Sequence, residues 1–135
     1  MLKGQAGYDF SYSGLKTAVI NYVNTAKQKG ETVNSADVAC SFQSAAVDIL
    51  VEKLFKAVKE KGVNTVTAGG GVVANGYLRE KLTETALKEK VKLVLPTKRY
   101  CTDNASMIAA EGYIQYLKRN FADLTLNATA SIPLR

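Results

Sequence analysis

Three consecutive glycines lie within residues 65–79 (TVTAGGGVVANGYLR), between a β-branched run and a helical pattern. A glycine-rich turn from a strand into a helix lets backbone N–H groups approach an anion, and the helix dipole favours negative charge there. No Lys-Ser/Thr pair follows Gly69, Gly70 and Gly71, so the segment is not a Walker A loop. The spacing predicts an anion-binding turn, with tight strand–helix packing as the alternative role for the glycines.

The same stretch also fits the dinucleotide pattern G-x-G-x-x-A, through Gly69, Gly71 and Ala74. In that fold an acidic residue follows the next strand, about 20 residues further on. Here residues 96–99 (PTKR) occupy that place, and two long helical segments precede a motif that normally opens its domain. Both departures disfavour nicotinamide binding.

Two polar side chains accompany the glycines. Asn75 lies in the first turn of the next helix, where its amide could bind a base or a ribose hydroxyl. Asp103 stands at the start of the last helix, after a second strand. Because loops after parallel strands gather at one edge of a sheet, we expect Asn75 and Asp103 to face the same space. Helix capping is the alternative role, by Asn75 for its own helix and by Thr102 or Asp103 for the last one.

A third group of polar residues lies near the N-terminus, in SYSGLKT. Ser13, Lys16 and Thr17 place a cation and two hydroxyls at the start of a helix, where they could hold a phosphate. Taken locally, these residues favour a capped helix with a solvated lysine over a phosphate site.

The elements that must position these residues alternate between strand and helix. Alternating residues from Tyr8 to Tyr12 predict a short strand, and the 74–90 pattern predicts a helix with Leu78, Leu82, Ala86 and Leu87 facing inward. The remaining predictions are helices at 15–29, 35–61 (capped by Asn34 or Ser35 and ended by Gly62) and 104–119, parallel strands at 64–68 and 91–95, and an irregular tail at 121–135. The pattern indicates one α/β unit with few strands.

Composition narrows the possible chemistry. The 135 residues contain no histidine, which removes Ser-His-Asp triads and most zinc sites, and the two cysteines form no C-x-x-C motif. A net charge of +6 favours polyanionic partners without identifying any. No apolar run approaches the roughly 20 residues of a membrane span, and the N-terminus lacks a signal-peptide core. We therefore expect a cytoplasmic protein without membrane contact.

Three stretches in this order, DFSYSGLKTAV, AGGGVVANGYLREKL and CTDNASMIAAEG, closely resemble the C-terminal part of the TsaD/Gcp (YgjD) family. These glycoprotease-family proteins are tRNA adenosine threonylcarbamoyltransferases, formerly named O-sialoglycoprotein endopeptidases. The resemblance extends over nearly the whole chain. It implies that residues 1–135 form a single C-terminal lobe fragment, part of a ribonuclease-H-like lobe of the actin/Hsp70/sugar-kinase (ASKHA) ATPase fold.

The resemblance also implies an activity and roles for individual residues. The family transfers a threonylcarbamoyl group from its adenylate to the exocyclic amine of the adenosine next to the anticodon in tRNA. Asn75 corresponds to a residue that binds the adenylate or an ATP-type nucleotide, with Gly69, Gly70 and Gly71 forming the adjacent loop. Asp103 corresponds to a ligand of the family's iron or zinc. Ser13, Lys16 and Thr17 match a signature near the cleft.

The chain also departs from the family. Its members are well over twice as long, and their other metal ligands are an H-x-x-x-H pair in the N-terminal lobe, which this histidine-free chain lacks. We therefore expect the isolated chain to be inactive and to bind no metal. The implied partners are tRNA, the missing N-terminal lobe, a paralogous subunit and the small ATPase of the bacterial complex.

A non-enzymatic role remains the alternative: a nucleotide-binding or partner-interaction module that forms a homo-oligomer through exposed surface. Peptidase activity is disfavoured, because the chain contains neither a nucleophile–base pair nor H-E-x-x-H.

Overall fold

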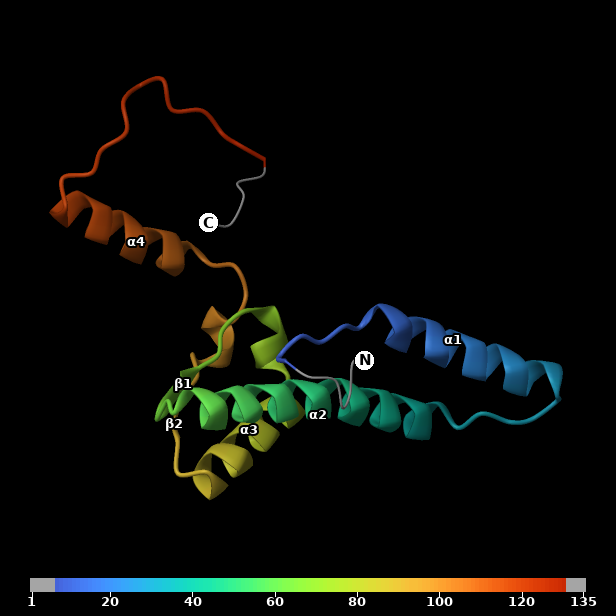
Figure 1. Ribbon diagram of the computed structural model, residues 1–135. Coiled ribbons are helices and arrows are strands. Elements are labelled where there is room, and N and C mark those ends of the chain that lie inside the picture. The colour runs from blue at the N-terminus through green and yellow to red at the C-terminus, as the bar shows by residue number, and fades with distance from the viewer. Residues whose placement is uncertain (1–6, 131–135) are drawn as a thin grey trace.

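A computed structural model describes residues 7–130 of the chain and shows a helix-rich α/β arrangement (Figure 1). The two strands are short, and four α-helices account for most of the described residues. In sequence order the elements are α1 (Ser13–Gln28), α2 (Ser35–Lys61), β1 (Thr65–Thr67), the 3₁₀ turn η1 (Gly71–Ala74), α3 (Gly76–Lys88), β2 (Lys92–Val94), the 3₁₀ turn η2 (Lys98–Tyr100) and α4 (Ala105–Leu117).

The sheet consists of the two parallel strands that the sequence predicts, joined by α3 as the crossover helix. Strands β1 and β2 pair in the register Thr65 with Lys92, Val66 with Leu93, and Thr67 with Val94. Each strand is shorter than its predicted range. Because both strands run in the same direction, the loops that follow them leave from the same edge of the sheet.

The core forms where α2, α3 and β1 meet. Helices α2 and α3 lie against one another beside the sheet (Figure 1). Their apolar stripes repeat every three or four residues, so one face of each helix can be buried. The buried cluster consists of Val47, Phe55 and Val58 from α2, Val66 from β1, and Leu78, Leu82 and Ala86 from α3.

The sequence predicts both ends of α2 correctly and the N-cap of α4 incorrectly. The Asn34 side chain accepts a hydrogen bond from the Ala36 amide at 3.0 Å, and Gly62 ends α2 with φ of 64°. Helix α4, however, is capped by Asn104, whose Oδ1 accepts from the Met107 amide at 3.2 Å. The predicted cap, Thr102 or Asp103, is wrong, because the extended backbone at Asn104 brings that residue's side chain over the first turn.

The predicted strand at residues 8–12 is also wrong. The Tyr8 hydroxyl donates to Glu60 Oε2 at 2.7 Å, and the Tyr12 hydroxyl donates to the Ala46 carbonyl at 2.8 Å. Alternate tyrosines thus bind the segment to α2 through their side chains. A strand also needs a backbone partner, and β1 and β2 pair with each other in the only sheet of residues 7–130.

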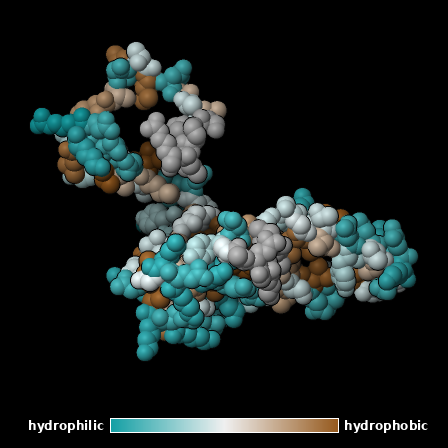
Figure 2. Space-filling model, in the orientation of Figure 1, coloured by the Kyte–Doolittle hydropathy of each residue, from teal (hydrophilic) through white to brown (hydrophobic). Residues whose placement is uncertain are grey.

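Apolar residues outside the core are less covered than their spacing predicts. Leu87, which the spacing places on the inward face, is 75% exposed, because it lies beside Val91, Leu93 and Leu95 on a side of α3 that no other described element covers. Helix α4 has no buried residue, and it projects away from the other helices (Figure 1). Figure 2 shows hydrophobic side chains at the surface there. Periodicity identifies residues that share a face, whereas only a packed neighbour buries them.

A helix that crosses a membrane must be long and apolar. Within the described part of the chain, no helix combines the length and apolarity needed to cross a bilayer.

Two leucines of α3 provide a direct test of this core. We expect Leu82→Ala, at a side chain that is 3% exposed, to lower the free energy of unfolding by about 2–5 kcal/mol, because it leaves a cavity. Leu87→Ala on the same helix should change it by less than about 0.5 kcal/mol. Urea denaturation followed by circular dichroism measures both. Equal losses for the two variants would contradict the described packing of α3.

Candidate functional site

Asn75 lies between η1 and α3, and both the oxygen and the nitrogen of its side-chain amide form hydrogen bonds. Its Oδ1 accepts from the Leu78 amide at 2.9 Å, so Asn75 caps α3, as the structural alternative predicts. Its Nδ2 donates to Gln43 Oε1 at 3.3 Å, which joins the cap to α2. An amide nitrogen carries two hydrogens, and Gln43 uses one of them. Among residues 7–130 the second N–H has no acceptor, so it can donate to a ligand.

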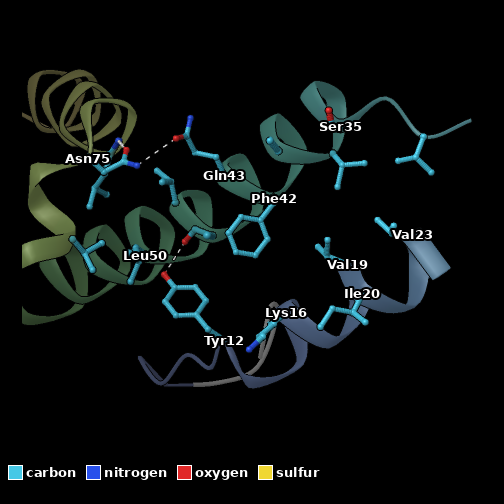
Figure 3. Close-up of a pocket in the computed structure, with 17 residues that line it drawn as sticks. Tyr12, Lys16, Val19, Ile20, Val23, Ser35, Phe42, Gln43, Leu50 and Asn75 are labelled. Carbon is cyan, nitrogen blue, oxygen red and sulfur yellow. Dashed lines mark hydrogen bonds between the residues drawn. The ribbon is translucent and has the colours of Figure 1, made fainter.

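Asn75 and Lys16 line the same groove, between α1 and α2 (Figure 3). The groove has a volume of about 850 Å³, within the range typical of small-molecule sites. Apart from a few polar groups its walls are apolar, with Val19 and Ile20 on α1 facing Phe42 on α2. The structure therefore brings together two of the residues that the sequence singles out, from segments about 60 positions apart.

Besides Asn75 and Lys16, the polar residues that line the groove are Tyr12, Ser35 and Gln43, and the sequence motifs singled out neither Tyr12 nor Gln43. Gln43 interrupts the apolar helical stripe formed by Ala39, Ala46 and Leu50. A polar residue in such a stripe is the sequence feature that could have identified Gln43 as part of a site. Tyr12 lines the groove beside Lys16, and its hydroxyl donates to the Ala46 carbonyl. Burial raises the pKa of the Tyr12 phenol, so this hydroxyl stays a neutral hydrogen-bond donor.

Of the three residues in the SYSGLKT segment, only Lys16 lines this groove. The Ser13 hydroxyl lies 2.9 Å from that of Ser11, at the first turn of α1. Tyr12 occupies the N-cap position of α1 and forms no side-chain cap, whereas the Ser11 hydroxyl accepts from the Ser13 amide at 3.4 Å. Lys16 is exposed, as the solvated-lysine alternative predicts. Thr17 is exposed and is not part of the groove lining.

The glycine turn has an open backbone rather than a tightly packed one. A Cβ added at Gly69 or Gly70 would meet no atom of the described chain within 4 Å, and at Gly71 it would meet only Thr102 Cγ2, at 4.0 Å. Tight packing therefore does not explain the three glycines. Gly70 has φ of 93°, a conformation that other residues adopt only with strain. The turn thus needs glycine at Gly70 and leaves its neighbouring backbone accessible.

The glycine turn lies against the loop that follows β2, as expected for loops at the same sheet edge. Gly71 approaches Thr102, and a Cβ added at Gly76 would lie 4.0 Å from Lys98 Nζ. Arg79, which the sequence motifs did not single out, donates to the Val73 carbonyl at 3.2 Å and to the Pro96 carbonyl at 3.0 Å. Arg79 therefore connects the two loops directly.

Asp103 belongs to this second loop but does not line the groove that contains Asn75. Its side chain is exposed, and Asn104 performs the capping role that was the alternative for Asp103. Within residues 7–130, no three His, Cys, Asp or Glu side chains are grouped closely enough to hold a metal ion. One carboxylate does not make a metal site, so the described residues do not fit a complete iron or zinc centre by themselves.

Comparison with known proteins places the chain in a family. The family model for tRNA N6-adenosine threonylcarbamoyltransferase, TsaD, matches residues 1–110. The chain belongs to the TsaD family. Curated proteins with that name are 44% identical to it in Clostridium novyi, 48% in Desulfitobacterium hafniense, and 49% in Lactobacillus delbrueckii subsp. bulgaricus. The alignments cover 93%, 93% and 94% of this chain, but only 37% of each relative.

The chain therefore spans little more than a third of the length of those relatives. Within that third it contains the groove, the glycine turn and the loop with Asp103. All three motifs on which the resemblance rests are thus placed, and Arg79 of α3 joins the glycine turn to the loop that contains Asp103.

The double role of Asn75 can be separated by two substitutions. We expect Asn75→Ala to lower the free energy of unfolding by about 1 kcal/mol, because the Leu78 amide loses its acceptor. Asn75→Asp keeps an acceptor oxygen at the cap and should stay within about 0.5 kcal/mol of the unsubstituted chain. Thermal unfolding monitored by circular dichroism compares them. Equal destabilisation by both variants would show that the bond to Gln43, and not the cap, is the stabilising contact.

Proposed function

We propose that this chain is the C-terminal part of an acyltransferase that forms threonylcarbamoyladenosine in tRNA. In the full-length form, the threonylcarbamoyl group passes from its adenylate to the exocyclic amine of the adenosine next to the anticodon. Membership of the TsaD family and the names of relatives at 44–49% identity support this reaction. The single structural observation that carries the proposal is the groove that unites Lys16 and Asn75.

The groove has the chemistry needed for an adenylate. Its apolar walls suit the flat face of a base, and the second N–H of Asn75 suits an acceptor atom on the base or ribose. The Lys16 ammonium opposes phosphate charge, and the open backbone at Gly69, Gly70 and Gly71 offers amides beside the start of α3. We assign the nucleotide to this groove, with Ser13 and Thr17 outside its direct contacts.

The β1–α3–β2 unit, with its two parallel strands, supports the assignment of a particular fold. Parallel strands joined by a crossover helix are the building unit of ribonuclease-H-like lobes, to which we assign residues 1–135. An N-terminal lobe with the H-x-x-x-H pair would form the opposite wall of the nucleotide cleft. The 37% coverage of the relatives leaves room for such a lobe.

We assign to Asp103 a single ligand position on the iron or zinc of the full-length enzyme. The Asp103 carboxylate does not cap α4, because Asn104 does, and this supports the role. The remaining ligands must come from outside the described residues. We assign no catalytic step to the metal here, since this chain does not hold it alone.

The remaining partners follow from the same proposal. The net charge of +6 suits a tRNA backbone, whose phosphates attract lysine and arginine. A paralogous subunit and a small ATPase would assist the full-length form in a bacterial complex, in the cytoplasm. The second candidate is a non-enzymatic nucleotide-binding or interaction module, which is favoured by a groove built entirely from this chain's own residues.

Activity assays distinguish the two candidates. The 135-residue chain, incubated with threonylcarbamoyl-adenylate and unmodified tRNA, should form no modified adenosine, because it has one wall of the cleft. The full-length form with its partner subunits should form it, and Asn75→Asp should reduce that rate at least tenfold by placing a negative charge beside the adenylate. The modified nucleoside is quantified by mass spectrometry.

Asn64→Asp is the matched control, since it makes the same charge change at an exposed position outside the groove. It should retain full activity. Sustained turnover by the isolated chain would contradict the half-site proposal, and inactivity of the full-length form would favour the module.

Metal content tests Asp103 separately. In the full-length form, Asp103→Ala should lower the bound iron or zinc to well under half of the unsubstituted value, because one anionic ligand is lost. Asp37→Ala, at an exposed carboxylate in the first turn of α2, is the control and should keep the metal. Elemental analysis of the purified proteins decides. Equal metal content in the two variants would remove Asp103 from the ligand set.

A further inference from the structure

Arg79 of α3 bridges two loops through its side chain. Its Nη1 donates to the Val73 carbonyl in η1 at 3.2 Å, and its Nη2 donates to the Pro96 carbonyl after β2 at 3.0 Å. We call these two bonds the Arg79 bridge. In the described part of the chain, no hydrogen bond runs directly from residues 69–75 to residues 95–104. The Arg79 bridge is therefore the hydrogen-bonded connection between the two loops.

The sheet does not set the spacing of these loops. At this edge, the bond furthest along the strands runs from the Ala68 amide to the Val94 carbonyl, at 3.3 Å. Beyond it, Pro96 has no N–H with which to continue the pairing. The glycine turn has no side chains to pack, and Gly70, at φ of 93°, adopts a conformation that few other residues share. Both loops thus leave the sheet without a partner strand, and the guanidinium connects them.

The two acceptors need an arginine in particular. A guanidinium holds several N–H donors in one rigid plane, so a single side chain can bind two carbonyls that belong to different loops. A lysine ammonium is one compact charge on a flexible stem and fixes no such geometry. Hydrogen bonds from a charged donor are also stronger than neutral ones. Both bonds of the Arg79 bridge are partly buried, where water competes less for the carbonyls.

Cys101 packs against the Arg79 bridge within the second loop. Its thiol is 3% exposed, and its Sγ lies 3.9 Å from Arg79 Nη1 and 3.6 Å from the Thr97 carbonyl oxygen. Asp103 follows two positions later in the same loop. Loss of the bridge would therefore uncover the Cys101 thiol and release the segment that contains Asp103.

The two loops have different roles in the proposed reaction. The glycine turn leads to Asn75, which we assign to the adenylate, and the second loop contains Asp103, which we assign to the metal of the full-length enzyme. Arg79 does not line the groove, and each of its Nη atoms already donates to a backbone carbonyl. It is thus placed to act through the two loops and not on the substrate.

We propose that Arg79 is a positioning residue, which sets the distance between the adenylate-binding turn and the Asp103 loop so that the groups they hold are aligned for transfer. The inference rests on the proposed function, because it takes the roles of Asn75 and Asp103 from it. A misplacement of about 1 Å caused far from the reacting atoms can lower a rate about 100-fold. The bridge makes none of the groove contacts, so its loss should lower kcat and leave the KM for the adenylate unchanged.

Steady-state kinetics of the full-length enzyme with its partner subunits tests this role. Arg79→Met removes both bonds and keeps an aliphatic side chain, so kcat should fall about tenfold or more, while the KM for threonylcarbamoyl-adenylate changes less than about twofold. Arg79→Lys keeps the charge but reaches one carbonyl at most, and its kcat should lie between the two. Lys88→Met is the matched control, because it removes a positive charge from an exposed position on the same helix and should retain kcat.

Labelling of Cys101 provides a second readout that needs no turnover. The buried thiol should react slowly with iodoacetamide in the unsubstituted enzyme, and Arg79→Met should raise that rate about tenfold or more, because the thiol loses its cover. Cys40 on α2 should react equally in both proteins and is the internal reference. Mass spectrometry of the peptides identifies the labelled cysteine. Circular dichroism shows that each variant is folded at the assay temperature.

Three results would overturn the positioning role. A folded Arg79→Met enzyme with unchanged kcat would make Arg79 merely structural, since a structural residue lowers the melting temperature without changing the rate of the folded enzyme. A raised KM at unchanged kcat would make it a substrate contact. Equal labelling of Cys101 with and without the bridge would show that the loops stay together by other contacts. An unsubstituted full-length enzyme that forms no modified adenosine would instead refute the proposed function, and the positioning role would fall with it.

Discussion

The contact of α2 with α3 across Val66 is the interaction on which the rest of this structure depends. A two-stranded parallel sheet is too small to be stable by itself, and burial of the apolar faces of α2 and α3 stabilises the strands and their crossover. Because β1 and β2 are parallel, the glycine turn and the Asp103 loop leave from the same edge, where Arg79 joins them. Asn75 is attached to Gln43 of α2, so its orientation and the stability of the core are coupled.

The same small core leaves much apolar surface uncovered. Helix α1 contacts the remainder through α2, and α4 buries nothing. In a family whose curated relatives are about two and a half times as long, such surface is expected to meet other protein.

Much of the fold could be predicted from residue spacing because it rests on local physics. Gly62 ends α2 in the left-handed conformation that glycine favours, Asn34 caps that helix, and the β-branched runs around Val66 and Leu93 form the parallel pair. Leu78, Leu82 and Ala86 share a face of α3 in any helix, and that face is buried. The motifs around Gly70, Asn75 and Asp103 identified the family in the same way, as local patterns of residues.

Tertiary structure decided the points that depend on distant neighbours. The alternation from Tyr8 to Tyr12 became no strand because α2, rather than another strand, accepts those side chains. Leu87 and the apolar residues of α4 stayed exposed because nothing in residues 7–130 packs over them. The packing of α1 against α2 likewise decides that Lys16 and Asn75 line the same groove. Sequence alone determined which residues could do chemistry and which helices could exist, whereas burial and convergence required the packed chain, since both are properties of surfaces that meet across dozens of residues.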